Sequence, residues 1–189
     1  MKRPRAFHGM EFSGMGITFN TYLVGPMGAG KSTIGKQLSK SLNVEFLDSD
    51  NEIIKRTGAD IPLIFELEGE AGFRKRESAV IADLTDKCPI LMATGGGAVL
   101  SPENRENLRN TGFVIYLKTS VNQQLRRTSR DKNRPLLQTE DPRKKLEELM
   151  ATRDPLYREV ADLIIETDGK HVKNVVKAII SELPEAFQR

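Results

Sequence analysis

Residues 25–33, which read GPMGAGKST, constrain the fold of this chain more than any other stretch. They fit the pattern G-x-x-x-x-G-K-[ST], a loop that holds nucleotide phosphates where it joins a buried strand to a helix. The preceding residues 18–24 are largely apolar, and residues 31–41 have a helical pattern. The alternative is a glycine-rich turn whose Ser32 only caps a helix, but the flanking strand and helix favour the phosphate loop.

The residue types of this loop suit a polyphosphate. Glycines let the backbone approach the phosphates, and successive N–H groups and the start of the helix point positive dipoles at them. Lys31 adds a cation at the terminal phosphates, and the Ser32 hydroxyl is a ligand for Mg²⁺. The residues expected to hold the phosphates are Gly28, Ala29, Gly30, Lys31, Ser32 and Thr33.

The phosphate loop alone does not identify the reaction. The sequence contains no N-K-x-D motif, which GTPases need to read the base, and no LSGGQ-like signature of ABC-type ATPases. A chain of 189 residues has room for one compact domain, as in kinases that phosphorylate small molecules. The acceptor of the phosphate must therefore be sought elsewhere in the sequence.

Apolar runs alternate with helix-length stretches, and most of the runs are continuous, as in strands covered on both faces. This alternation predicts an α/β fold of three layers, with a central five-stranded parallel sheet between helices. The predicted strands are residues 18–24, 44–47, 90–93, 113–117 and 163–165. The predicted helices are residues 31–41, 51–57, 61–85, 102–110, 121–129, 143–160 and 171–181.

We predict one kinase-like domain over residues 17–189. Residues 1–16 start with basic residues and have no apolar segment long enough for a signal peptide, so we expect a flexible N-terminal extension. Residues 48–72 and 129–141 look less regular than the rest. We expect a substrate-binding region at about residues 48–77 and a mobile lid at about residues 129–141.

Composition points to a cytoplasmic protein that binds small molecules. No apolar run is long enough to span a membrane, and the single cysteine, Cys88, cannot form an internal disulfide, which suits a reducing compartment. The net charge of +3 is mild, and the basic residues gather at 126–134 in a chain with few aromatics. A pocket for anionic small molecules explains this as well as a nucleic acid would. We expect a monomer with no membrane and no nucleic-acid partner.

Two aspartates follow the second predicted strand. Side chains two residues apart on an extended segment point the same way, so Asp48 and Asp50 can both face the crevice where ligands bind in open α/β sheets. One carboxylate can serve Mg²⁺, and the other can accept a hydrogen bond from an acceptor hydroxyl. The segment also fits a capping box with Ser49 at the N-cap and Glu52 three residues later, which would leave both aspartates free.

A glycine triplet and several arginines suit an anionic acceptor. Residues 94–97, TGGG, follow the third predicted strand, where glycines let a flat ligand lie against backbone N–H groups, although an ordinary loop is the alternative. Arginine binds carboxylate and phosphate through a planar fork, but a single surface arginine is more often only solvated. Glu77 lies three residues after Arg74 on a predicted helix and can hold its guanidinium. The candidate arginines are Arg74, Arg134 and Arg153.

The motifs GPMGAGKST, FLDSD, GEAGFRKRE, ATGGG, RPLL and RDPLY, in this order and at these intervals, resemble the shikimate kinase family. The resemblance covers about residues 18–180, and its specificity lies in the combination of DSD, GFR, TGGG and RPLL. It implies a fold similar to that of nucleoside monophosphate kinases. It also implies ATP-dependent phosphorylation of the 3-hydroxyl of shikimate, a step toward chorismate and the aromatic amino acids.

The resemblance implies roles for the acceptor-site residues. Asp50 matches the residue that binds the substrate hydroxyls, and Arg74 and Arg153 match the clamp on the substrate carboxylate. The residues that match the floor and the apolar walls of the substrate pocket are Gly95, Gly96, Gly97, Phe65 and Phe73.

The resemblance implies further roles around the nucleotide. Asp48 matches a residue that helps Ser32 to hold Mg²⁺, Arg134 matches a lid arginine that reaches the phosphates, and Arg127 matches one near the adenine. Since phosphoryl transfer depends on positioning and charge stabilisation, we expect Lys31 and Arg134 to offset charge on the moving phosphoryl group. Asp50 would orient the acceptor hydroxyl and is a candidate base.

Two other functions remain open from the sequence. A kinase for another small acceptor, such as a nucleoside monophosphate or gluconate, would share the loop and the fold. A non-catalytic nucleotide-dependent binding module would lose its binding partner steeply with salt if that partner were a nucleic acid. The presence of Lys31, Ser32, Asp48 and Asp50 together argues against the second.

Overall fold

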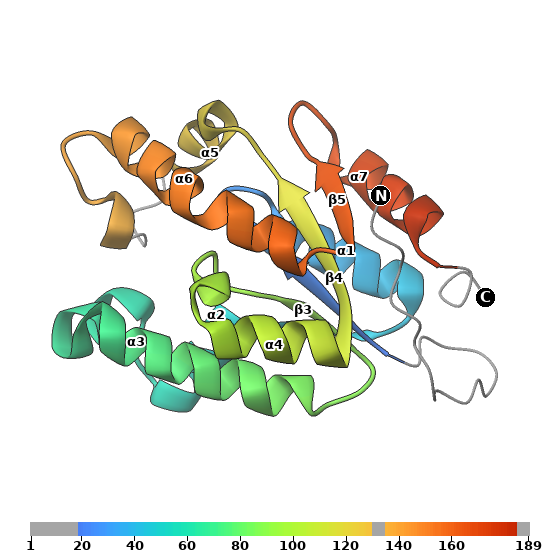
Figure 1. Ribbon diagram of the computed structural model, residues 1–189, viewed down its shortest axis with the longest axis horizontal. Helices are drawn as coiled ribbons and strands as arrows, with labels where there is room; N and C mark the ends of the chain where they lie inside the picture. The colour runs from blue at the N-terminus through green and yellow to red at the C-terminus, as the bar shows by residue number, and fades with distance from the viewer. Residues whose placement is uncertain (1–18, 130–134, 185–189) are drawn as a thin grey trace.

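The structure of this chain, a computed structural model, describes residues 19–129 and 135–184. The expected N-terminal extension at residues 1–16 lies outside the described residues, as do Thr18, Arg134 and residues 130–133 of the expected lid. The strands form one parallel sheet in the order β2-β3-β1-β4-β5 (Figure 1), which confirms the predicted architecture. The strands are β1 (Asn20–Val24), β2 (Glu45–Asp48), β3 (Ile90–Ala93), β4 (Gly112–Lys118) and β5 (Leu163–Glu166).

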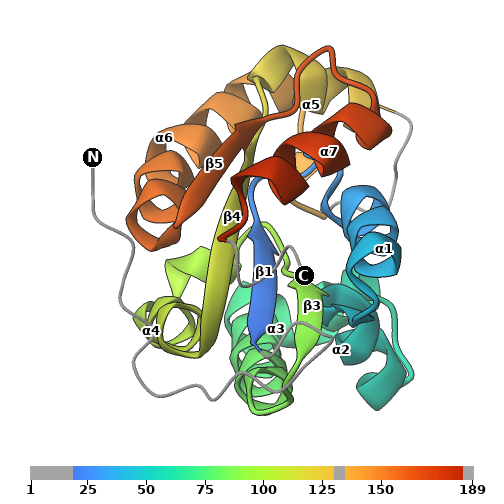
Figure 2. The ribbon, with the colours of Figure 1, turned by 90° about the vertical axis from the view of Figure 1, so that its right-hand side faces the viewer.

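Helices cover both faces of the sheet, which gives the three layers (Figures 1 and 2). Helices α1 and α7 pack together on one face, and α3, α4 and α6 lie on the other. In the part of the chain that the structure describes, no helix is long and apolar enough to cross a membrane. The helices are α1 (Lys31–Leu42), α2 (Ser49–Thr57), α3 (Ile61–Thr85), α4 (Pro102–Thr111), α5 (Val121–Thr128), α6 (Pro142–Val160) and α7 (Val172–Glu182), with 3-10 turns η1 (Ala98–Leu100) and η2 (Pro135–Leu137).

Burial on both sides of the sheet explains why the strand sequences are continuously apolar. In β1, Tyr22 and Val24 belong to the core under α3 and α4, whereas Leu23 belongs to the core under α1 and α7. All five residues of β1 are buried. A strand with this burial cannot alternate apolar and polar residues.

The strand order brings three loops together at one end of the sheet. In the parallel register Leu23 of β1 pairs with Ala93 of β3, and Ala93 also pairs with Asp48 of β2. The chain leaves these strands at the same level, so the phosphate loop, the DSD segment and the glycine triplet meet at the carboxyl edge.

Residues 48–72 are more regular than the sequence suggested, and this expectation was wrong. The segment consists of α2 and the first turns of α3, because buried Ile53 and Ile64 give each helix an apolar side and Asp60 caps α3 by accepting from the N–H of Leu63. The irregularity is confined to Gly69, whose φ of 69° and ψ of 180° interrupt α3. Residues on both sides of the break line the acceptor pocket described below, Ile61 and Phe65 before it and Phe73 and Arg74 after it.

Gly69 and Gly58 form a matched pair for testing this break. Both have φ near 68° and open space around the missing Cβ, but ψ is 180° at Gly69 and 7° at Gly58. Alanine tolerates the left-handed helical region at about 1 kcal/mol, whereas the region of Gly69 is nearly restricted to glycine and costs about 3 kcal/mol. Urea denaturation should therefore show Gly69→Ala to be clearly more destabilising than Gly58→Ala, and equal losses would contradict the assignment.

Candidate active site

The side chain of Lys31 folds back onto the phosphate loop. Lys31 Nζ donates to the carbonyls of Gly25 at 2.7 Å and Pro26 at 2.9 Å, so the ammonium lies across the loop. Arg127 of α5 donates from Nη1 to the carbonyl of Gly28 at 2.7 Å. This hydrogen bond joins the phosphate loop to α5. The cavity at this loop is lined by Met27, Gly28, Gly30, Lys31, Ser32, Thr33, Asp48, Asp50, Thr94, Gly96 and Arg127.

Ala29 is the one predicted phosphate-binding residue that does not reach this cavity. Its side chain is fully buried in the core under α1, and its N–H donates to the carbonyl of Pro26 at 3.3 Å. The N–H of Ala29 therefore forms a hydrogen bond within the turn of the loop instead of pointing into the cavity.

The two carboxylate oxygens of Asp48 have different partners. Its Oδ2 accepts from the Ser32 hydroxyl at 2.6 Å, and its Oδ1 accepts from the N–H groups of Asp50 and Asn51 at 3.1 and 3.2 Å. Asp48 is thus the N-cap of α2, and the capping box predicted at Ser49 is wrong. The reason is that β2 runs through Asp48, so the boundary between strand and helix falls one residue earlier.

The two other members of the expected capping box have different partners. The buried Ser49 hydroxyl accepts from the N–H of Gly95 at 3.0 Å, which joins α2 to the glycine triplet. Glu52 pairs with Arg56 one turn further along α2. Asp50 lies in the first turn of α2 rather than on an extended segment, and it still faces the same crevice as Asp48.

The oxygens of Ser32 and Asp48 fit the predicted Mg²⁺. A hydroxyl and a carboxylate in contact at the phosphate cavity are hard oxygen donors, and Mg²⁺ is usually held by few protein oxygens together with waters and substrate phosphates. Among residues 19–129 and 135–184 no cluster of three or more His, Cys, Asp or Glu side chains could hold a metal alone. A nucleotide would have to complete the site.

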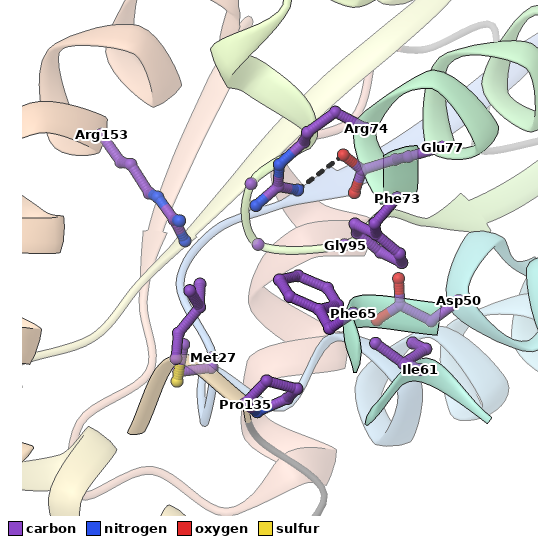
Figure 3. Close-up of a pocket in the computed structure, with 13 residues that line it drawn as sticks. Met27, Asp50, Ile61, Phe65, Phe73, Arg74, Glu77, Gly95, Pro135 and Arg153 are labelled. Atoms are coloured by element: carbon purple, nitrogen blue, oxygen red, sulfur yellow. Dashed lines mark hydrogen bonds and ion pairs between the residues drawn. The ribbon is translucent and has the colours of Figure 1, made fainter. Parts of the chain in front are cut away.

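A second pocket adjoins the phosphate cavity (Figure 3). The rings of Phe65 and Phe73 contact each other with centroids 4.8 Å apart, and the Arg74 guanidinium lies 5.3 Å from the Phe73 centroid. All of the residues predicted for the acceptor lie here. The pocket is lined by Asp50, Phe65, Phe73, Arg74, Gly95, Gly96, Gly97 and Arg153, together with Met27, Ile61, Glu77, Pro135 and Leu136.

Arg74 is held in place by two carboxylates. It donates from Nη1 to Glu77 at 2.7 Å and from Nη2 to Glu70 at 2.9 Å, and Figure 3 shows the pair with Glu77. Glu77 is only 1% exposed, and this burial raises its pKa even though the neighbouring guanidinium acts in the opposite direction. The expected role of Glu77 in holding Arg74 agrees with this geometry.

Arg153 differs from Arg74 in its charge balance. Its side chain is only 4% exposed, yet it forms no ion pair within 4 Å with any carboxylate of the described residues. A buried guanidinium without a carboxylate is costly, so an anionic ligand in this pocket would stabilise it. Arg153 enters from α6, and Arg74 enters from α3 (Figure 3).

Several pocket residues were not identified from the sequence. Met27 lies inside the phosphate loop and lines both cavities, and Pro135 and Leu136 belong to the RPLL motif, of which only Arg134 was selected. Because these residues lie inside the motifs, they could have been selected as candidates from the sequence. Nothing in the sequence marked Ile61 as a pocket residue, because at the start of α3 it is one of several apolar residues of a helix.

The two adjoining cavities define a class of protein. A phosphate loop at the carboxyl edge of a parallel sheet, next to a pocket for an anionic acceptor and joined to it by Asp50, is the arrangement of a P-loop kinase. The shikimate kinase family model matches residues 27–184. The chain belongs to the shikimate kinase family.

Individual relatives agree with this assignment. A shikimate kinase of Thioalkalivibrio sulfidiphilus is 62% identical over 162 residues, which cover 86% of this chain and 85% of that protein. A shikimate kinase of Methylococcus capsulatus is 59% identical over 90% of this chain and 95% of its own length. The structure of Acinetobacter baumannii shikimate kinase in complex with shikimate superposes with a TM-score of 0.85 at 54% identity, covering 87% of this chain and 92% of that one.

The raised pKa of Glu77 gives a testable dependence of stability on pH. A carboxyl with a raised folded-state pKa stabilises the fold below its unfolded value and loses this contribution as pH rises through the folded value. Glutamine does not titrate, so the melting temperature of Glu77→Gln relative to wild type should rise as the pH increases above the ordinary pKa of a glutamate, about 4.3. Thermal denaturation at several pH values measures this.

Glu52→Gln is the matched control for this prediction. Arg56 lowers the pKa of the half-buried Glu52 by hydrogen bonding, so the stabilisation from Glu52 is present above the unfolded value and is lost in acid. The stability of this variant relative to wild type should therefore fall as pH rises. The same trend in both variants would contradict a raised pKa at Glu77.

Proposed function

We propose that this chain transfers the γ-phosphoryl group of ATP to the 3-hydroxyl of shikimate, giving shikimate 3-phosphate and ADP. The observation that carries the proposal is the composition of the acceptor pocket. The carboxylate of Asp50 and the buried guanidinium of Arg153, which has no ion pair with the part of the chain that the structure describes, face the same cavity from different sides (Figure 3). A ligand with a carboxylate and hydroxyl groups on one small ring matches both.

The acceptor would be held at both of its ends. Its carboxylate would bind Arg153 and Arg74, whose forks suit bidentate contacts. Its ring would lie against the glycine triplet and Phe65 and Phe73. Asp50 lines both the acceptor pocket and the phosphate cavity, so a hydroxyl bound to it would lie next to the terminal phosphate. Asp50 would orient this hydroxyl and accept its proton as transfer proceeds.

The nucleotide would be held by the phosphate loop. Lys31 would exchange its loop carbonyls for phosphate oxygens, and Arg127 would stay beside the loop near the base. Ser32 and Asp48 would hold Mg²⁺, which when bound neutralises charge on the phosphates. Arg134 lies outside the described residues, and from its place in the RPLL motif we assign it to the phosphoryl group in transfer.

The rival functions fit the acceptor pocket less well. A nucleoside monophosphate needs space for a base and a phosphate, whereas the pocket beside Asp50 is small and walled by Phe65, Phe73 and Ile61. Gluconate is a flexible open chain and would not need a floor of three glycines. A non-catalytic module has no use for a carboxylate that faces both cavities.

The direct test is ADP release from MgATP in a coupled assay, with and without shikimate. We expect a large shikimate-dependent rate, because the bound hydroxyl lies closer to the terminal phosphate than bulk water does. Gluconate and nucleoside monophosphates serve as control acceptors. A rate of ADP release that does not respond to shikimate would contradict shikimate as the acceptor, but it would not contradict nucleotide binding at the phosphate loop.

Arg74 and Arg76 lie two residues apart on α3 and form a matched pair for the carboxylate clamp. Arg74 faces the acceptor pocket, whereas the exposed Arg76 pairs with Glu68 on the outside. Arg74→Ala should raise KM for shikimate about 30-fold, the loss typical of a charged hydrogen bond, and leave KM for ATP unchanged. Arg76→Ala should change neither constant. Steady-state kinetics test this, and an unaltered KM for shikimate in Arg74→Ala would remove it from the clamp.

A further inference from the structure

Tyr157 is a buried tyrosine of α6 that lies directly behind the acceptor pocket. It is fully buried, and its side chain does not line either cavity. It belongs to the RDPLY motif, one helical turn after Arg153. The position places its hydroxyl next to two parts of the acceptor site that come from different segments of the chain.

The Tyr157 hydroxyl interacts with both of these parts. It donates to the backbone carbonyl of Gly96, and the guanidinium of Arg153 lies close enough to interact electrostatically with the same hydroxyl. A Cβ placed on Gly96 would be 3.8 Å from Arg153 Nη1, so the guanidinium and the glycine loop are neighbours. The hydroxyl therefore bridges the floor of the pocket and the guanidinium that has no carboxylate partner among the described residues.

The ring of Tyr157 is itself firmly held. It packs against the ring of Tyr116 on β4 with centroids 4.9 Å apart at an angle of 31°. Tyr116 donates its hydroxyl to Asp154 at 2.7 Å, and Arg158 donates to the same carboxylate at 2.6 Å. A ring supported in this way can fix the direction of whatever its hydroxyl contacts.

The contact to Gly96 also orients the peptide unit between Gly96 and Gly97. Because the unit is planar and trans, a carbonyl that points at Tyr157 sends the N–H of Gly97 in the opposite direction. Glycine gives the backbone no steric preference of its own here. The hydrogen bond from Tyr157 thus replaces the restraint that a side chain would otherwise provide.

We propose that Tyr157 is a positioning residue for recognition of the acceptor carboxylate, because it sets the orientation of the Arg153 guanidinium and of the Gly96 carbonyl together. The inference rests on the proposed function of the pocket. Tyr157 contacts neither acceptor nor nucleotide; it acts through Arg153 and the glycine floor. Its loss should weaken binding of a carboxylate-bearing acceptor and leave nucleotide binding intact.

Tyr157→Phe tests this, with Tyr22→Phe as the matched control. Tyr22 is also fully buried and its hydroxyl also has two partners, Asn20 and Thr111, but at the opposite end of the sheet. Tyr157→Phe should raise KM for shikimate about tenfold, the effect of one lost hydrogen bond, with kcat and KM for ATP nearly unchanged. Tyr22→Phe should lower the melting temperature without changing either KM.

Methyl shikimate separates positioning from general packing. The ester removes the charge that Arg153 recognises, so the tenfold difference between wild type and Tyr157→Phe should shrink toward one with this substrate. If Tyr157→Phe is too unstable at 25 °C, the same comparison is made at lower temperature and with Tyr157→Met, which fills the space without a hydroxyl.

The outcomes distinguish this inference from the proposed function. A wild-type rate that ignores shikimate would overturn the function itself. An active wild type with unchanged KM for shikimate in Tyr157→Phe would overturn only the role of Tyr157. A rise in KM that is equal for shikimate and its methyl ester would also overturn it, because the carboxylate would then not be involved.

Discussion

The active site depends on how closely the glycine triplet approaches the helices that face it. A Cβ on Gly97 would lie 2.3 Å from the Arg74 guanidinium, and one on Gly95 would lie 2.4 Å from Glu77 and 2.8 Å from Asp50. A methyl group does not fit at these distances and would displace the ends of the Arg74, Glu77 and Asp50 side chains from their positions in the pocket. Three elements far apart in the sequence can therefore share one small pocket only because this loop has no side chains.

The two arginines of this pocket differ in the number of carboxylates that pair with them. Arg74 already has two carboxylate partners, Glu70 and Glu77, so the carboxylate of a ligand would be its third acidic neighbour. Arg153 is buried and forms no ion pair within 4 Å among the described residues, although the carboxyl of Glu77 is near enough to interact with it electrostatically. The protein thus retains an unfavourable buried charge that an anionic acceptor relieves, which makes stability and recognition compete at this residue.

The sequence predicted most of the fold because strands covered on both faces have an unmistakable pattern. It also predicted which loops meet, since parallel strands end at the same edge. The break at Gly69 and the N-cap at Asp48 were missed because both depend on where a neighbouring element ends, which local patterns leave open by a residue. Tyr157 is part of the RDPLY motif but was not predicted to be a site residue, because a tyrosine at helical spacing is typical of the hydrophobic core. Its contacts with Gly96 and Arg153, which only the structure shows, distinguish it.

The shared wall between the cavities explains why the phosphate would pass to a hydroxyl rather than to water. Of residues 19–129 and 135–184, only Met27, Asp50 and Gly96 line both cavities, so donor and acceptor would be separated by a single layer of these residues. Pro135 and Leu136, which follow the RPLL arginine, add apolar walls on the acceptor side. Water that enters this pocket gains the contact with Asp50 but cannot supply a carboxylate for Arg153. An acceptor that satisfies both residues is therefore held beside the phosphate longer and in one orientation, and proximity then favours transfer to its hydroxyl.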